Sequence, residues 1–310
     1  MHSYWREIVL LIGDCFEKID EIEEKSVQAI VTSPPYWGLR DYKVGGQLGE
    51  ELVPEDFVLK LTAFFRKAKR VLKDDGTLWI NIGDTYFGAK GGHWEGGNSI
   101  TSDETGHNYR MHRKAPPKHS RLKIKDLTGV PWMLAFSLQK DGWYLRQDII
   151  WHKPNPMPEA VKDRCVKSHE YIFLLSLKSK YYFDYKAIQE KAVFAGDNRG
   201  ARKDSRRGEL LANSIAAVSQ PTGEFRNKRD VWSINTAQSG EAHFAVFPEK
   251  IPELCIKAGT KEGDVVLDPF MGSGTTANVA KRLSRKWIGI ELNKDYAKFI
   301  NTKTAQEEIF

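Results

Sequence analysis

The stretch DVVLDPFMGSGTT at residues 264–276 decides the fold. Its apolar residues at 265–267 indicate a buried strand, its glycines at 272 and 274 indicate a turn, and Thr275 is typical of a helix start. Glycine lets a backbone approach a ligand closely, and the amides of a helix N-terminus point into the same crevice. This order of strand, turn and helix predicts an α/β fold with a ligand site where the strand ends.

Two acidic residues follow predicted strands beside this crevice. Asp268 ends the first strand, and its charge suits a ligand with an ammonium group or hydroxyl donors. The segment WIGIE at 287–291 indicates the next strand, and it ends in Glu291, where a doubly wound fold carries its ribose-binding acid. The stretch lacks the Gly-Lys-Thr of a phosphate loop and the glycine spacing of a dinucleotide site. We therefore expect neither a nucleoside triphosphate nor NAD.

Alternating strands and helices are predicted along the rest of the chain. Strands are expected at 8–12, 29–31, 77–82, 145–151 and 170–176. Helices are expected from Phe16, over 55–72 and over 131–140, with the residues 74–76 ending the second helix. A chain of 310 residues with 41% hydrophobic content can bury one substantial core plus a smaller appendage.

The tetrapeptide Ser33-Pro34-Pro35-Tyr36 follows the apolar run 27–31. A Pro-Pro turn is rigid and leaves two carbonyl groups without a local partner. A planar base could stack on the Tyr36 ring while its amino group donates to the Ser33 hydroxyl and the Pro34 carbonyl, so the ring is the expected functional part of Tyr36. This arrangement suits methylation of an amino nitrogen. An ordinary strand-to-loop turn is the alternative, because Pro-Pro punctuates many loops.

Taken in order, these motifs resemble the S-adenosylmethionine-dependent amino-group DNA methyltransferases of the β class, in which the catalytic motif precedes the cofactor motif. The resemblance covers most of the chain. It assigns residues 13–15 to the turn that receives the cofactor adenine, 148–156 to the lining of the target-base pocket, and 243–248 to the motif that closes over the methionine end of the cofactor. It implies S-adenosylmethionine as cofactor and a Rossmann-like, doubly wound, mostly parallel sheet with inserted DNA-recognition loops.

The motifs and the resemblance together give the expected site residues. The expected catalytic residues are Ser33, Pro34, Pro35 and Tyr36. The expected cofactor contacts are Asp14, Phe244, Phe247, Asp268, Phe270, Gly272, Ser273, Gly274, Thr275 and Glu291. The expected DNA contacts are Arg113, Lys114, Lys153, Arg202, Arg206, Arg207, Arg226 and Arg229.

Positive charge is concentrated in two stretches of the chain. The net charge is +6 with a pI near 9.0, which favours binding to a polyanion. The stretches 110–125 and 199–229 are rich in lysine and arginine, and a solvated loop is the alternative interpretation of each. We expect residues 186–230 to be the target-recognition region and 86–125 to be a second DNA-facing loop or a lid. Residues 1–185 and 231–310 then form the catalytic and cofactor-binding domain.

Cysteine and histidine usage narrows the chemistry. The three cysteines, at 15, 165 and 255, show no spacing typical of a zinc site or a disulfide framework, and no His-Glu-x-x-His pattern occurs. No metal is expected, and a reducing cytoplasm is the expected location. Methylation at cytosine C5 uses a Pro-Cys dipeptide, and no cysteine here follows a proline. No transmembrane run or secretory signal is predicted.

Cytosine N4 is the preferred target, because the resembling family more often pairs serine at the first motif position with cytosine N4 and aspartate with adenine N6. Adenine N6 is the alternative, since both side chains accept from either amino group. An inactive DNA-binding module and a protein or RNA amide methyltransferase are two further alternatives. The resemblance implies double-stranded DNA as partner, a cognate restriction endonuclease as a candidate partner, no membrane association, and a monomer or homodimer.

Overall fold

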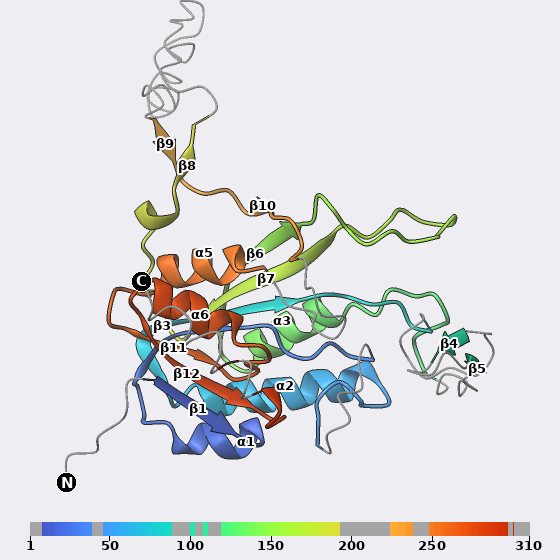
Figure 1. The fold of residues 1–310 in the computed structure, drawn as a ribbon, viewed down its shortest axis with the longest axis horizontal. Coiled ribbons are helices and arrows are strands. Elements are labelled where there is room, and N and C mark those ends of the chain that lie inside the picture. Colours follow the sequence, from blue (N-terminus) through green and yellow to red (C-terminus); the bar gives the residue numbers. More distant parts are fainter. Residues whose placement is uncertain are drawn as a thin grey trace, which may run out of the picture.

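The computed structural model describes residues 8–38, 46–88, 100–102, 108–110, 119–192, 224–237, 248–296 and 300. Its centre is an eight-stranded sheet in the order β1-β12-β11-β2-β3-β7-β6-β10 (Figure 1). The strands are β1 (Ile8–Ile12), β2 (Val27–Thr32), β3 (Leu72–Ile82), β6 (Tyr144–His152), β7 (His169–Ser176), β10 (Val231–Ser233), β11 (Val265–Asp268) and β12 (Lys286–Glu291). Only β7 runs antiparallel to its neighbours, β3 and β6. The predicted doubly wound, mostly parallel sheet is confirmed.

Helices cover both faces of this sheet (Figure 1). The helices α1 (Cys15–Lys18), α2 (Pro54–Ala68) and α3 (Val130–Lys140) lie on one face, and α5 (Lys250–Gly259) and α6 (Thr275–Arg282) lie on the other. Strand residues alternate between the two cores: Ile30 packs with the first group, whereas Ala29 and Val31 pack with the second. Burial on both faces explains why the central strands are continuous apolar runs.

The strand order reverses between β11 and β2. From β11 the chain passes through α6 to β12 on one side, and from β2 it passes through α2 to β3 on the other. The two strands pair in parallel, with Val266 opposite Ala29 and Leu267 opposite Ile30. In open α/β sheets, ligands bind outside the carboxyl ends of the strands at such a switch point. The segments that follow β11 and β2 are the two motifs singled out in the sequence.

The predicted end of the second helix is wrong. Helix α2 ends at Ala68, and residues 74–76 lie inside β3, which begins at Leu72. A Cβ on Gly76 would lie 2.9 Å from the Gln28 carbonyl oxygen, so glycine here permits close approach of β2 rather than a helix stop. Helix α5 was not predicted, and its first turn contains Pro252, a position where proline is tolerated.

Two small antiparallel ribbons stand away from the main sheet (Figure 1). The first pairs β4 (Ile100–Ser102) with β5 (Asn108–Arg110), and the second pairs β8 (Glu190–Lys191) with β9 (Phe225–Arg226). They fall within the stretches 86–125 and 186–230, where the inserted loops are expected. Two 3-10 turns, Ile19–Glu21 and Lys186–Ile188, complete the regular elements among the described residues. No helix of that part of the chain is long and apolar enough to cross a membrane.

Candidate active site

Glu291 anchors the glycine turn after β11. Its carboxylate accepts hydrogen bonds from the Gly272 amide at 2.7 Å and from the Asn293 amide at 2.8 Å. Gly272 and Gly274 have φ values of 53° and 84°, a conformation that favours glycine. Burial raises the pKa of Glu291, and the bonds to the backbone amides oppose that rise. Each carboxylate oxygen keeps a second lone pair with which it could accept from a ligand hydroxyl.

The Gly13-Asp14 turn lies beside Glu291. The Gly13 amide donates to the Glu291 carbonyl oxygen at 2.9 Å, which joins the ends of β1 and β12. One oxygen of Asp14 accepts from the Phe16 amide at 2.7 Å and caps α1. Asp14, Gly272 and Glu291 therefore lie at the same edge of the sheet.

Asp268 differs from the sequence-based expectation of a ligand contact. Its side chain is 1% exposed. One oxygen accepts from the Thr32 hydroxyl at 2.6 Å and from the Phe270 amide at 3.1 Å, and the other accepts from the Thr276 hydroxyl at 2.6 Å. Thr32 is the last residue of β2, directly before the catalytic motif. The carboxylate thus ties the segment before Ser33 to the glycine turn after β11.

Burial raises the pKa of Asp268 to about 6, and the three hydrogen bonds oppose the rise. Because the folded-state pKa exceeds the unfolded value of 3.8, the protonated carboxyl stabilises the fold at low pH. This stability is lost as the pH rises from the unfolded pKa through the folded pKa of about 6. Between pH 4.5 and pH 7.5 the unfolding free energy of the wild type should therefore fall by roughly 2 kcal/mol relative to that of Asp268→Asn, which has no group to ionise at this position. Urea unfolding at both pH values measures this. The expectation would be contradicted if the unfolding free energies of the wild type and the variant changed by the same amount between the two pH values.

The remaining described residues of the predicted cofactor set lie on or beside the same turn. The Phe270 ring packs on the Phe64 ring at 5.2 Å, so part of its surface belongs to the core. Thr275 is 6% exposed at the start of α6. Ser273 is partly buried in the turn. Phe244 and Phe247 lie outside the described residues.

The Ser-Pro-Pro-Tyr motif borders a small pocket. Pro34 is buried, and Ser33, Pro35 and Tyr36 are partly exposed. The pocket lies next to Tyr36 at the carboxyl end of β3, and its lining residues are Tyr36, Trp37, Gly83, Asp84, Thr85 and Val130. Apart from Tyr36, these residues were not predicted, because most of them come from loops whose side chains show no periodic pattern.

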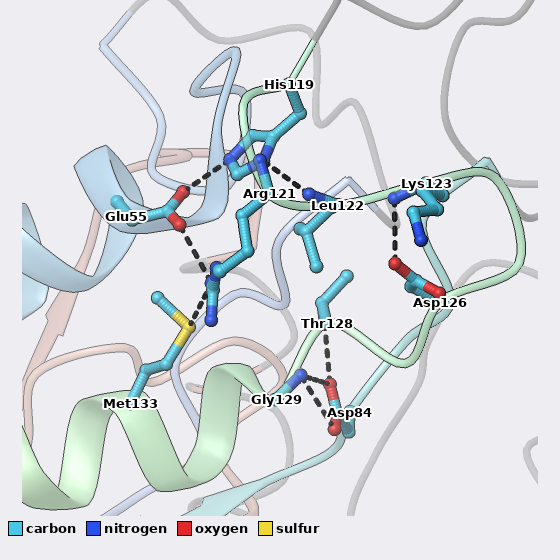
Figure 2. Close-up of polar contacts among 10 residues, drawn as sticks. All are labelled: Glu55, Asp84, His119, Arg121, Leu122, Lys123, Asp126, Thr128, Gly129 and Met133. Atoms are coloured by element: carbon cyan, nitrogen blue, oxygen red, sulfur yellow. Dashed lines mark hydrogen bonds and ion pairs between the residues drawn. The ribbon is translucent and has the colours of Figure 1, made fainter.

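Asp84 fixes one wall of this pocket (Figure 2). Its carboxylate accepts from the Thr128 hydroxyl at 2.7 Å and from the Gly129 amide at 3.1 Å, directly before α3. Gly129 has a φ of 78°, which favours glycine at this turn. This wall of the pocket is therefore held by bonds between segments far apart in the sequence.

The described part of the first basic stretch packs against the protein (Figure 2). Glu55 on α2 accepts from His119 at 2.9 Å and from Arg121 at 2.9 Å, and Lys125 pairs with Asp163 at 2.7 Å. Burial alone would raise the pKa of Glu55, but the bonds from His119 and Arg121 hold it below its ordinary value. His119, Arg121 and Lys125 therefore have partners within the fold, and the Arg121 and Lys125 side chains remain largely exposed. Arg113 and Lys114 lie outside the described residues.

Three predicted DNA contacts are described, and all pair with glutamates. Lys153 forms an ion pair with Glu170, beside the pocket. Arg226 and Arg229 both pair with Glu190, at 2.9 and 2.8 Å, where the β8–β9 ribbon begins. Lys228 joins the same glutamate at 3.3 Å, so this cluster keeps a net positive charge. Arg202, Arg206 and Arg207 lie outside the described residues. No cluster typical of a metal site occurs among the residues that the structure describes.

Known proteins are similar to this chain in sequence along nearly its whole length. The Type II methyltransferase M.SmaI of Serratia marcescens is 45% identical over 297 residues, covering 96% of this chain and 90% of its own. M.Cfr9I of Citrobacter freundii is 45% identical over 287 residues, covering 93% and 84%.

Solved structures agree in fold. The PvuII DNA methyltransferase superposes with a TM-score of 0.65 at 20% identity, covering 97% of this chain and 87% of its own. A Thermus thermophilus protein complexed with S-adenosyl-L-methionine superposes with a TM-score of 0.57 at 25% identity, covering 98% and 96%. The family model for DNA methylases of the N6 and N4 class matches residues 27–302, and the chain belongs to this family of amino-group DNA methyltransferases.

Proposed function

We propose that this protein transfers a methyl group from S-adenosylmethionine to the exocyclic nitrogen of a cytosine that it flips out of double-stranded DNA. The observation that carries the proposal is the 2.6 Å hydrogen bond between Thr32 and Asp268. It holds the Ser-Pro-Pro-Tyr motif against the glycine turn at the switch point of the sheet. Donor and acceptor of a methyl group must meet at such a junction.

The glycine turn fits the proposed cofactor. Among the described residues, a Cβ built on Gly272 would meet only the Phe270 carbonyl oxygen, at 3.9 Å, so these residues leave the space above the glycine open. Glu291 stands beside it, and its carboxylate suits ribose hydroxyls, while Asp14 at the next strand end suits the adenine amino group. When bound, S-adenosylmethionine supplies an electrophilic methyl group on a sulfonium. The protein's task is to place the acceptor nitrogen in line with it.

The catalytic motif suits an amino nitrogen. The lone pair of an exocyclic amino group is delocalised into the ring, so the nitrogen is a weak nucleophile. Hydrogen bonds to the Ser33 hydroxyl and the Pro34 carbonyl would localise this pair and aim it at the methyl carbon. The new carbon–nitrogen bond forms as the sulfur–carbon bond breaks, and the nitrogen then loses one proton to water. Unstacking a duplex base costs a few kcal/mol, which stacking on Tyr36 helps to offset.

Cytosine N4 is favoured over adenine N6 by Ser33 at the first motif position. The PvuII enzyme, which shares the fold, is specific for cytosine N4. Adenine N6 is the second candidate, because a hydroxyl accepts from either amino group. We also propose a restriction-modification role with a cognate endonuclease as partner, in keeping with the Type II relatives.

We propose residues 186–230 as the target-recognition region, with Arg206 and Arg207 on DNA phosphates. Replacing both by alanine should weaken DNA binding and lower the salt slope of log affinity by about one unit per lost phosphate contact, while cofactor affinity stays constant. The matched control is Lys25→Ala with Lys178→Ala, since these lysines pair with Asp74 at 3.0 and 2.9 Å, at the opposite end of β3. Equal slopes for the two double variants would remove residues 186–230 from the DNA interface.

Methyl transfer from labelled S-adenosylmethionine tests the proposal as a whole. The full chain is incubated with duplex DNA, with RNA and with a protein mixture, and label is counted in each. Transfer to duplex DNA alone is expected. Transfer to RNA or protein alone would support an amide methyltransferase, and tight DNA binding without any transfer would support an inactive DNA-binding module.

A further inference from the structure

The hydroxyl of Tyr36 has a fixed partner, whereas the sequence assigned a function only to the ring. It donates a hydrogen bond to Glu170 Oε2 at 2.5 Å. Burial raises the pKa of Tyr36 well above its ordinary value, and the charge of Glu170 adds to this rise, while Ser33 and the Gly83 backbone oppose it. The phenol therefore stays protonated at neutral pH and remains a donor.

Glu170 is itself held from two sides. It lies near the start of β7, beside the end of β3, where Ile82 pairs with Tyr171. Lys153 forms an ion pair with its other oxygen, and the Asn81 amide donates to Oε2 at 3.2 Å. The Glu170 side chain is only 12% exposed. A shielded carboxylate with donors on both oxygens has one preferred orientation.

Lys153 is fixed in turn, because its ammonium lies 4.4 Å from the centre of the Trp151 ring. Trp151 pairs with Glu170 across β6 and β7. Lys167, a second cation near this carboxylate, donates to the Asp84 carbonyl oxygen at 2.5 Å in the pocket wall. The network therefore joins β3, β6 and β7 to the base of the pocket.

Gly83 brings the Tyr36 ring and Glu170 into contact. A Cβ on this glycine would lie 2.8 Å from Tyr36 Cε2 and 3.2 Å from Glu170 Cδ. The ring is thus restrained at its tip by the hydrogen bond and along its edge by the Gly83 backbone. Tyr36 and Gly83 both line the pocket. A tilt of the ring would require the carboxylate or the backbone to move.

We propose that Glu170 is a positioning residue of the target-base pocket, which sets the plane of the Tyr36 ring by holding its hydroxyl. The inference rests on the proposed function, in which the target base stacks on that ring. A base stacked on a tilted ring presents its nitrogen away from the methyl carbon, and a displacement of about 1 Å can cost about a hundredfold in rate. Lys153 compensates the charge of Glu170 beside the pocket.

A double-mutant cycle on Tyr36→Phe and Glu170→Gln tests this role. Glutamine has a single acceptor oxygen, which the Lys153 ammonium attracts, so its NH2 group faces the Tyr36 hydroxyl. The hydroxyl can then only accept from this group, and the short bond that it donates to a charged carboxylate is lost. The control is Glu253→Gln on α5, because Glu253 is 17% exposed and pairs with Lys250 and Lys257 away from the pocket. The readouts are the single-turnover rate of DNA methylation with cofactor and DNA saturating, and cofactor affinity by calorimetry.

Each single variant should lower the single-turnover rate about tenfold to a hundredfold, and the double variant should be no slower than the slower single variant. Cofactor affinity and the Glu253→Gln rate should match the wild type. A wild-type rate in Tyr36→Phe, which preserves the packing, would overturn the inference. The inference would also be overturned if the rate loss of the double variant equalled the product of the two single-variant losses, because the two residues would then act independently. A wild type that leaves DNA unmethylated overturns the proposed function and this inference together, whereas an active wild type with an unaffected Tyr36→Phe overturns the inference alone.

Discussion

Ser33→Ala should lower the turnover number about a hundredfold or more while the affinity for S-adenosylmethionine stays constant. The Ser33 hydroxyl would accept a hydrogen bond that strengthens as the amino nitrogen becomes pyramidal, so its loss acts on the transition state rather than on cofactor binding. Steady-state methylation of duplex DNA gives the turnover number, and calorimetry gives the cofactor affinity.

Ser26→Ala is the matched control for this variant. Ser26 is partly exposed, and its hydroxyl donates to the Glu23 carbonyl at 2.8 Å before β2, at the opposite end of the strand from Ser33. It should retain wild-type turnover. If Ser33→Ala lost cofactor affinity in proportion to turnover, the serine would belong to the cofactor site and the catalytic assignment would be wrong.

Glu291→Ala should weaken the binding of S-adenosylmethionine by about 1.5–3 kcal/mol, the range of hydrogen bonds to charged groups. The structure adds a second reason, because this carboxylate also anchors the Gly272 amide at 2.7 Å. Glu291→Gln keeps one acceptor oxygen and should fall between the wild type and the alanine variant. Calorimetric titration with the cofactor measures all three proteins.

Glu262→Ala, in the exposed turn before β11, is the control for lost charge and should bind the cofactor like the wild type. Thermal unfolding shows whether the Glu291 variants remain folded. A folded Glu291→Ala protein with unchanged cofactor affinity would remove Glu291 from the cofactor site.

The local patterns in the sequence were sufficient to predict the strand, turn and helix start at residues 264–276. An apolar strand, two glycines and a helix start are determined by neighbouring residues, and α6 begins at Thr275 as the sequence indicates. Buried parallel strands are recognisable because both of their faces are apolar.

Contacts between distant segments could not be predicted from the sequence. Glu170 lies 134 positions from Tyr36, and they meet only because β7 inserts antiparallel beside β3. A strand-end acid such as Asp268 can face a ligand or a neighbouring strand. Nothing in its local sequence shows that the hydroxyl of Thr32, 236 positions away, donates a hydrogen bond to its carboxylate. Basic residues likewise look alike in a sequence whether they face DNA or, like Arg121 in its loop, a glutamate on α2.

The identity of the methylated nucleoside tests the central proposal most directly. Duplex DNA treated with the full chain and S-adenosylmethionine is digested to nucleosides and resolved by mass spectrometry, with the Ser33→Ala protein as the control. N4-methylcytosine that appears with the wild type and is strongly reduced with the variant is the expected result. N6-methyladenine as the product would contradict the choice of base, and the absence of any methylated nucleoside would contradict the proposed activity.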